Sequence, residues 1–252
     1  MVSPSRVLAL IPARGGSKSI PRKNLLLLQG IPLLAYSIQA ARESKRRPRI
    51  LVSTEDDEIA KCAETWGAEV PFRRPMELAQ DDTLDLPVFL HALDWLEAAE
   101  GYRPDIVVQL RPTSPLRPPD LVDRAVEILE AKADADSVRA VIPAGQNPFK
   151  MWRMTPSGTL TPLFDSGIFE AFNQPRQALP PAYWQTGHID VARLRTLREK
   201  ASMTGDVIYP VLLDPRYAID LDTPDDWTRL SFRLEAGFDL PWIRPARGEP
   251  ER

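Results

Sequence analysis

A short apolar strand that runs directly into a glycine-rich, basic loop constrains this chain most strongly. Residues 7–11 are apolar without alternation, which is typical of a strand in a parallel sheet covered by helices on both faces. The loop that follows contains Gly15 and Gly16, where the backbone can adopt unusual conformations and approach a ligand closely. It also holds four cations, Arg14, Lys18, Arg22 and Lys23. The pattern predicts a phosphate-binding loop.

Two of the four cations suit different modes of phosphate binding. Arg14 can offer a planar fork to phosphate oxygens, whereas Lys23 is a mobile point charge. The loop does not fit the P-loop pattern G-x-x-x-x-G-K-[ST], so it predicts phosphate binding without predicting an ordinary P-loop NTPase. The alternative is a solvated basic loop that has no ligand.

The rest of the first 143 residues alternates apolar strands with helical patterns. Strands are expected at 49–53, 70–72, 105–110 and 137–142, and helices at 32–41, 54–66, 83–100 and 118–133. Repeated βα units predict a doubly wound, mostly parallel sheet in three α/β/α layers. Because ligands bind at the carboxyl ends of such strands, the loops 14–23, 74–83 and 111–117 should converge.

Composition narrows the class of protein. The chain has 252 residues, is 43% hydrophobic and carries a formal net charge of -3, which fits one α/β domain over 1–252 and argues against nucleic acid or an anionic membrane as partner. Cys62 is the single cysteine, so an intramolecular disulfide and a cysteine-based metal cluster are excluded. With no signal-like or membrane-length apolar run, a cytoplasmic protein is expected.

The βα alternation breaks in the segment 144–190, which we expect to form an inserted β-rich arm. Residues 147–164 predict two short strands joined by Pro-Ser-Gly, with several large apolar side chains that such a small unit cannot bury. The arm is therefore expected either to fold back on the sheet or to pack on a second copy of the chain, and its density of apolar side chains favours the second outcome, a homodimer. Beyond it we expect a helix at 192–200, a strand at 207–213 and a disordered tail at 244–252.

Two carboxylates near the C-terminus suggest a metal site. Asp220 and Asp222 alternate with apolar residues, so an extended backbone would turn both toward the same side. Mg²⁺ often takes one or two carboxylates and completes its shell with substrate phosphates. Thr223 and the acids Asp225 and Asp226 have the pattern of a helix N-terminus, which predicts capping roles for these two acids.

Five separate stretches now identify a resemblance. They are IPARGGSKSIPRKN at 11–24, FRRPMELAQDDT at 72–83, LRPTSPLR at 110–117, NPFKMW at 147–152 and YAIDLDTPDDW at 217–227. In order and spacing they resemble the CMP-sialic acid synthetase, or acylneuraminate cytidylyltransferase, family over almost the whole chain. The resemblance implies a Rossmann-like nucleotidyltransferase fold and the transfer of CMP from CTP to a nine-carbon 2-keto sugar acid, with release of pyrophosphate.

The resemblance also implies roles for individual residues. Arg14, Lys23 and Asp222 would be catalytic, and Asp220 and Asp222 would hold Mg²⁺. Asp222 is either the base for the sugar hydroxyl or a second metal ligand with no proton role. The nucleotide would contact Arg14, Gly15, Gly16, Ser17, Lys23, Asn24, Arg74, Ala79, Asp82 and Thr83.

The sugar site is implied partly from the arm, across a dimer interface. Its expected residues are Arg111, Thr113, Ser114, Lys150, Arg176, Trp184, Gln185 and His188. The chain departs from many relatives here, because Arg111 replaces a glutamine and residues 184–188 replace R-P-N-G-A. A bulky Trp184 and a titratable His188 could reshape the pocket for another nonulosonate, such as the deaminated sugar or a di-amino form, so the choice between these sugars and N-acetylneuraminate stays open. The alternatives are a turn role for Thr113 and Ser114 and a structural role for His188. For Lys150 and Arg176, the alternative is that each is a surface cation beside the arm.

Two alternative functions are also compatible with the sequence. One is activation of the eight-carbon sugar acid of lipopolysaccharide, against which the arm and the TSPLR loop weigh. The other is a non-catalytic nucleotide-binding subunit, which would be expected to lose the paired aspartates or the basic loop, and this chain keeps both. An α/β hydrolase is disfavoured because the chain lacks the G-x-S-x-G motif.

Overall fold

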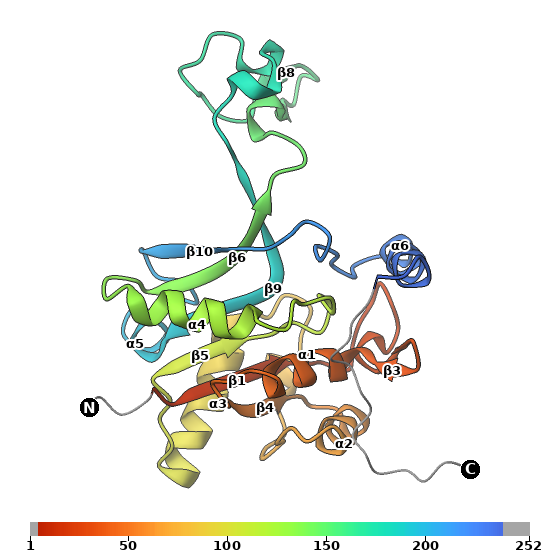
Figure 1. The fold of residues 1–252 in the computed structure, drawn as a ribbon, viewed down its shortest axis with the longest axis vertical. Coiled ribbons are helices and arrows are strands. Elements are labelled where there is room, and N and C mark those ends of the chain that lie inside the picture. Colours follow the sequence, from red (N-terminus) through yellow and green to blue (C-terminus); the bar gives the residue numbers. More distant parts are fainter. Residues whose placement is uncertain (1–4, 239–252) are drawn as a thin grey trace.

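The computed structural model describes residues 5–238 and is built around a six-stranded sheet (Figure 1). The strands are β1 (Val7–Pro12), β4 (Arg49–Ser53), β5 (Ile106–Gln109), β6 (Ser137–Pro143), β9 (Tyr183–Arg193) and β10 (Ile208–Leu212). Their spatial order is β10-β6-β9-β5-β1-β4, with β9 antiparallel to both neighbours and the other pairs parallel. The predicted mostly parallel sheet is confirmed.

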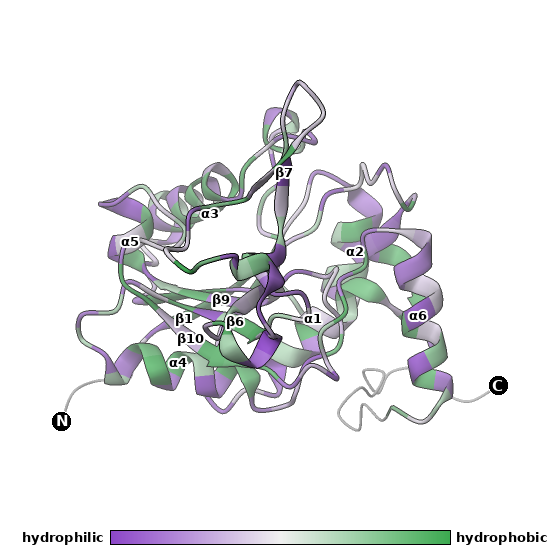
Figure 2. Ribbon diagram, turned by 90° about the horizontal axis from the view of Figure 1, so that it is seen from above, coloured by the Kyte–Doolittle hydropathy of each residue, from purple (hydrophilic) through white to green (hydrophobic). Residues whose placement is uncertain are grey.

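Helices cover both faces of this sheet, as the three-layer prediction requires. They are α1 (Leu33–Arg42), α2 (Asp57–Thr65), α3 (Asp85–Glu100), α4 (Leu121–Ala131) and α5 (Leu194–Arg198). A sixth helix, α6 (Pro224–Glu235), packs in a separate apolar cluster with α1. Side chains of α1, α2 and α4 share one apolar core with the sheet, and those of α3 and α5 share another. Figure 2 shows α3 and α4 on opposite sides of the strands.

Short elements build the carboxyl edge of the sheet and the loops above it. They are η1 (Lys23–Leu25), β2 (Leu27–Leu28), β3 (Ile31–Pro32) and η2 (Met76–Leu78). A third apolar cluster packs β2, β3 and α1 against Ile219, Leu221 and α6. This cluster places the paired aspartates beside the basic loop, although the two lie about 200 residues apart in the chain.

One predicted strand was wrong, one strand was not predicted, and one predicted helix is shorter than expected. The expected strand at 70–72 is reduced to a single bridge between Leu51 and Glu69, because Pro71 has no N–H to continue a ladder. The long strand β9 was not predicted, since its sequence mixes polar and apolar residues without a clear period. The helix expected at 192–200 is correspondingly short, because Ala192 and Arg193 end β9.

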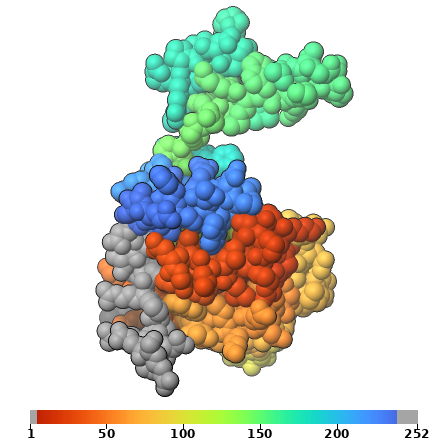
Figure 3. Space-filling model, turned by 90° about the vertical axis from the view of Figure 1, so that its right-hand side faces the viewer, coloured from red at the N-terminus to blue at the C-terminus, as the bar shows by residue number. Residues whose placement is uncertain are grey.

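The arm projects from the sheet where β6 and β9 extend beyond it (Figure 1). It contains η3 (Pro148–Lys150), β7 (Trp152–Met154), β8 (Leu160–Pro162), η4 (Ala171–Asn173) and η5 (Arg176–Ala178). β7 and β8 form the hairpin expected from Pro-Ser-Gly, with Gly158 at φ +83°. Figure 3 shows the arm as a lobe that stands away from the body. The tail expected at 244–252 lies outside the described residues.

No helix within 5–238 is long and apolar enough to cross a membrane. Cys62 is a free thiol, half-buried on α2, and burial raises its pKa. It lies among apolar neighbours of the sheet core, so it has a packing role.

Candidate active site

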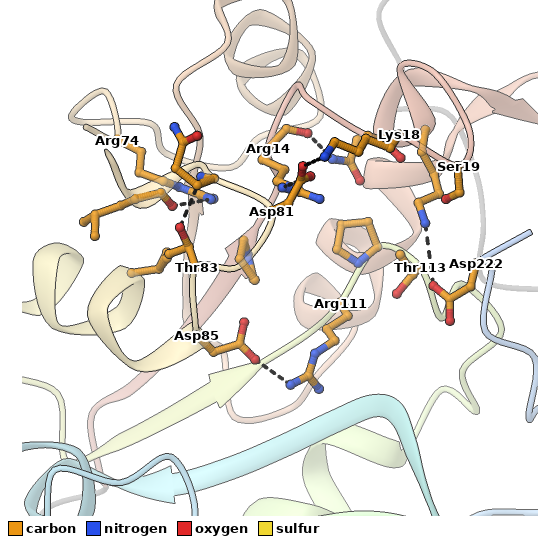
Figure 4. Close-up of a pocket in the computed structure, with 18 residues that line it drawn as sticks. Arg14, Lys18, Ser19, Arg74, Asp81, Thr83, Asp85, Arg111, Thr113 and Asp222 are labelled. Carbon is orange, nitrogen blue, oxygen red and sulfur yellow. Dashed lines mark hydrogen bonds and ion pairs between the residues drawn. The ribbon is translucent and has the colours of Figure 1, made fainter. Parts of the chain in front are cut away.

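A cleft of about 440 Å³ lies at the carboxyl ends of β1 and β5 (Figure 4). Its walls come from the basic loop after β1, the segment around η2, the turn after β5 and Asp222. The predicted convergence of the three loops is confirmed. The basic loop contributes Arg14, Ser17, Lys18, Ser19, Lys23 and Asn24.

Lys23 joins the basic loop to the acidic segment. Its side chain is buried, and Nζ donates a hydrogen bond to the carbonyl of Leu221 at 2.6 Å and lies 3.7 Å from Oδ1 of Asp222. Burial lowers the pKa of Lys23, and the nearby Asp222 carboxylate partly opposes that effect. Asn24 stabilises the loop by donating to the carbonyl of Arg14 at 2.8 Å.

The two glycines act differently from the prediction. Neither has a positive φ, and neither lines the cleft. Gly15 is needed for a close approach, because a Cβ there would lie 2.6 Å from Oδ2 of Asp56 at the start of α2. Its N–H donates to Oε1 of Glu55 at 2.6 Å, whereas Gly16 faces open space.

Arg22 is also structural. It is the residue of this loop in the left-handed region, at φ 54°, and its guanidinium pairs with Asp56 and Glu58 at the N-terminus of α2. These contacts hold Arg22 outside the cleft lining, so Arg14, Lys18 and Lys23 are the cations of the basic loop that face the cleft.

The segment around η2 supplies a carboxylate that the sequence reading missed. Asp81 pairs with Arg14 at 2.8 Å and with Lys18, and these two cations hold the pKa of Asp81 below its usual value. Asp82 was expected here, but Asp81 lines the cleft instead. Nothing in the dipeptide Asp-Asp indicates which carboxylate turns inward.

The other residues predicted to bind the nucleotide line the cleft only in part. Arg74 and Thr83 line the cleft with Leu78 and Gln80. Arg74 is buried, and its guanidinium donates to Ser53 and to the carbonyl of Leu78, so it shapes the wall. Ala79 does not line the cleft, because it ends η2 with its N–H bonded to Met76.

The paired aspartates face the site together, as the alternation predicted. Ile219 and Leu221 are buried, while Asp220 and Asp222 both line a second pocket of about 570 Å³. Asp220 accepts a hydrogen bond from Ser114, and Asp222 is largely exposed. Asp226 completes a capping box with Thr223 and also accepts from the N–H of Asp222 at 3.2 Å. Its predicted capping role is confirmed, whereas Asp225 lies in the first turn of α6 without a capping bond.

Asp220 and Asp222 are the two carboxylates that line the second pocket, and they are the residues that would hold a Mg²⁺ ion there. Residues 5–238 contain no group of three or more His, Cys, Asp or Glu side chains suited to a metal. Mg²⁺ commonly needs no more than one or two carboxylates when phosphates are present.

The second pocket is lined by half of the residues that were expected to bind the sugar. Arg111, Thr113, Trp184 and Gln185 line it together with Thr186 and Gly187. Ser114 is buried and uses its hydroxyl on Asp220. Gly187 permits this contact, since a Cβ there would lie 2.5 Å from Ser114 Oγ.

His188 does not reach either pocket, in contrast to its expected sugar contact. It is fully buried, with Nε2 2.9 Å from the carbonyl oxygen of Tyr217. Burial and the adjacent Arg117 lower its pKa to about 3. The imidazole is therefore neutral at physiological pH, and its role is structural.

Lys150 and Arg176 lie on the arm, where they line neither the cleft nor the second pocket of the same chain. Lys150 is exposed at the end of η3. Arg176 donates to the carbonyl of Ala144 at 2.9 Å beside a separate pocket at the base of the arm. A single chain does not bring these two residues to the other residues predicted to bind the sugar.

Asp85, Asp190 and Arg139 were also missed. Asp85 opens α3 and binds Arg111 at the cleft wall. Asp190 and Arg139 each interrupt an otherwise apolar stretch of strand, at HIDVA and SVRAVI. A charged residue within a buried strand needs a partner, and this signal could have found both residues.

A Rossmann-like sheet with a cationic cleft and two adjacent carboxylates at its carboxyl edge defines a nucleotidyltransferase. A model of the cytidylyltransferase family matches residues 8–151. The chain is 36% identical to a CMP-N,N'-diacetyllegionaminic acid synthase of Legionella pneumophila, over 88% of this chain and 93% of the relative. The chain therefore belongs to the cytidylyltransferase family, and the resemblance to CMP-sialic acid synthetases is confirmed.

Two further comparisons agree. An N-acylneuraminate cytidylyltransferase A of Danio rerio is 32% identical over 87% of this chain, which spans 48% of that longer relative. A solved CMP:2-keto-3-deoxy-manno-octonic acid synthetase complexed with CTP has a TM-score of 0.64 at 16% identity, covering 92% of this chain and 99% of that one. At this identity the structural likeness supports the fold alone.

Proposed function

We propose that the chain transfers CMP from CTP to the anomeric hydroxyl of a nine-carbon 2-keto sugar acid and releases pyrophosphate. One observation carries this proposal: Arg111, Thr113 and Asp222 line both the cationic cleft and the second pocket. Two substrates bound in these pockets would meet at these three residues. The relatives at 30% identity or more that are named as CMP-sugar acid synthases support the same reaction.

The charges of the cleft suit the triphosphate. Arg14, Lys18 and Lys23 would bind phosphate oxygens after Asp81 releases the first two. The sugar hydroxyl oxygen would form the new bond to the α-phosphorus while the bond from phosphorus to the pyrophosphate oxygen breaks. The catalytic effect rests mainly on positioning and on fixed positive charge around the phosphates.

Asp222 is suited to accept the hydroxyl proton because its exposed carboxylate stands between the two pockets. Asp220 and Asp222 would also hold Mg²⁺, which would neutralise phosphate charge when bound. Ser114 fixes Asp220, and Asp226 fixes the backbone at Asp222.

We further propose a cytoplasmic homodimer formed through the arm. Lys150 and Arg176 line neither the cleft nor the second pocket of their own chain, and both are cations of the kind that bind a sugar carboxylate. Each would serve the sugar site of the second subunit. The arm also exposes Met154, Leu160 and Phe169.

An eight-carbon sugar acid is the second candidate substrate. The fold alone does not separate the two, because the solved synthetase for the eight-carbon acid shares it at 16% identity. The nine-carbon assignment is favoured by relatives named for legionaminic, pseudaminic and N-acylneuraminic acids.

The test is pyrophosphate release from CTP and Mg²⁺ with a panel of nine-carbon and eight-carbon 2-keto sugar acids, with the nucleotide product identified by mass. We expect turnover of a nine-carbon acid. Turnover of the eight-carbon acid alone would select the second candidate. If no acid is turned over while CTP still binds, a non-catalytic nucleotide-binding subunit would be favoured.

Asp222→Asn tests the assigned chemistry. We expect loss of turnover by at least about 100-fold, because the side chain can no longer accept a proton or hold a cation well. CTP binding without metal should persist, which calorimetry can measure. Asp225→Asn, which changes an exposed acid of α6, is the matched control and should stay near wild type. Near-normal turnover of Asp222→Asn would refute the assigned role.

A further inference from the structure

Three neighbouring strands carry a row of polar residues across the α3 face of the sheet. Gln109 of β5 and Arg139 of β6 are the register partners of Asp190 on β9, so the three side chains project on the same face. The rest of this face is apolar, where Leu8, Leu10 and Val107 pack against α3. Gln109 and Asp190 are buried, and buried polar groups require hydrogen-bond partners.

Asp190 connects two arginines. Its buried carboxylate accepts from Arg111 Nη1 at 2.8 Å through Oδ2 and from Arg139 Nε at 2.6 Å through Oδ1. Arg139 in turn donates to Oε1 of Gln185 at 2.8 Å, and Gln185 lines the second pocket. One carboxylate therefore links a residue at the cleft to a residue at the base of the arm.

Arg111 is held from three sides. Besides Asp190, its Nη2 donates to Oδ2 of Asp85 at 2.7 Å and to Oε1 of Gln109 at 3.2 Å. These three bonds use three of the five N–H groups of a guanidinium. The other two have no acceptor in the part of the chain that the structure describes, and Arg111 lines both pockets.

The charges of this cluster are balanced. Arg111 and Arg139 carry two positive charges, and Asp85 and Asp190 carry two negative charges. A guanidinium that already faces two carboxylates has little charge left to attract an acid group, although it keeps its directional N–H donors. Its geometry therefore suits an uncharged oxygen better than the sugar carboxylate or a phosphate.

We propose that Asp190 is a positioning residue that fixes Arg111 between the two pockets, where the guanidinium donates to an uncharged oxygen of the sugar acid, a hydroxyl or an amide carbonyl. The proposal rests on the function proposed above and adds a determinant of substrate choice. Through Arg139, the Asp190 carboxylate also holds Gln185 in the wall of the second pocket.

The test is Asp190→Asn, which keeps the shape of the side chain and removes its charge. We expect the KM for the sugar acid to rise by about tenfold, because Arg111 loses a charge-assisted hydrogen bond, while the KM for CTP changes by less than about twofold. Asp136→Asn is the matched control. It removes an equally buried carboxylate at the opposite edge of the sheet, where Asp136 binds Lys200, and should leave both KM values unchanged.

Arg111→Gln separates positioning from a merely structural effect. It should raise the sugar KM by itself, and adding Asp190→Asn to it should raise that KM little further, because both changes remove the same contact. Unchanged sugar KM in both variants, or equal rises for sugar and CTP, would overturn the inference while leaving the proposed function intact. Wild-type protein that turns over no sugar acid would overturn both.

Discussion

At the scale of single residues, the cleft contains its own counter-anion. Asp81 pairs with Arg14 and Lys18, the same side chains that would bind a triphosphate. All three side chains are partly or largely exposed, so solvent and salt screen both ion pairs and each of them is weak. A nucleotide must displace Asp81 from both cations, and this displacement lowers the apparent affinity.

Asp81→Asn should therefore tighten CTP binding. The expected decrease in Kd is about two- to fivefold, since the variant loses a competing carboxylate and keeps both cations. Calorimetry with CTP at two salt concentrations would measure it. Asp82→Asn, which changes the neighbouring acid outside the cleft lining, is the control and should bind like wild type. Weaker binding by Asp81→Asn would instead show that Asp81 contacts the nucleotide favourably.

His188 makes stability depend on pH. Its folded pKa is about 3, whereas a histidine in an unfolded chain titrates near 6.5. Below pH 6.5 the histidine binds a proton in the unfolded chain, whereas in the folded chain it stays neutral down to about pH 3. The free energy of unfolding is therefore unaffected by this group above pH 6.5 and decreases as the pH falls from 6.5 toward 3. Between pH 7 and pH 5 this group should lower the free energy of unfolding by about 2 kcal/mol.

His188→Gln should remove most of that pH dependence. Glutamine does not titrate and can still donate to the carbonyl of Tyr217, the partner of the imidazole. Urea unfolding of both proteins at pH 7 and pH 5 gives the comparison, and the difference between the two pH values is the relevant quantity even if the variant is less stable overall. Equal losses in the two proteins would contradict a buried neutral imidazole.

At the scale of secondary structure, the segment that holds the paired aspartates depends on the start of α6. Thr223 caps this helix by accepting from the N–H of Asp226, and Asp226 binds back to Thr223 and to the N–H of Asp222. The capping box therefore stabilises the helix and the neighbouring site segment together.

Thr223→Ala should lower the free energy of unfolding by about 1 kcal/mol, the usual effect of losing an N-cap side chain. Thr228→Ala is the matched control, because it makes the same substitution on an exposed interior position of α6. Alanine favours helix at such a position, so the control should be neutral or slightly stabilising. Urea midpoints measure both, and equal shifts would argue against the capping box.

The elements that could be predicted from sequence were those with a clear period and a clear end. The strand 7–11 and α3, which ends at Gly101 with φ +63°, are examples. β9 could not be predicted, because its partner strands β5 and β6 are distant in sequence and its polar residues pair with residues of those strands. The basic loop and the paired aspartates could be predicted because their chemistry is contained in a short stretch of sequence. The inward turn of Asp81 and the burial of His188 could not, because both depend on tertiary packing.

At the scale of the whole molecule, the arm is a structure with too little core of its own. It exposes Met154 and Leu160, which are register partners in the β7–β8 hairpin, together with Phe164 and Phe169. Apolar side chains gathered on a small projecting lobe favour burial against another protein surface. Within a symmetric dimer the same lobe would bring Lys150 and Arg176 toward the second subunit's sugar pocket.

Leu160→Asp should disrupt this assembly, because it places a charge on the apolar hairpin surface where a partner would pack. We expect sedimentation to show a shift from twice the chain mass of 28.3 kDa toward the single chain, and kinetics to show a rise in the sugar KM with little change for CTP. The matched control is Phe232→Asp, an equally drastic change at an exposed apolar residue of α6, far from the arm. A monomeric wild-type protein with full activity would refute the dimer, whereas a dimeric Leu160→Asp variant would place the interface elsewhere on the molecule.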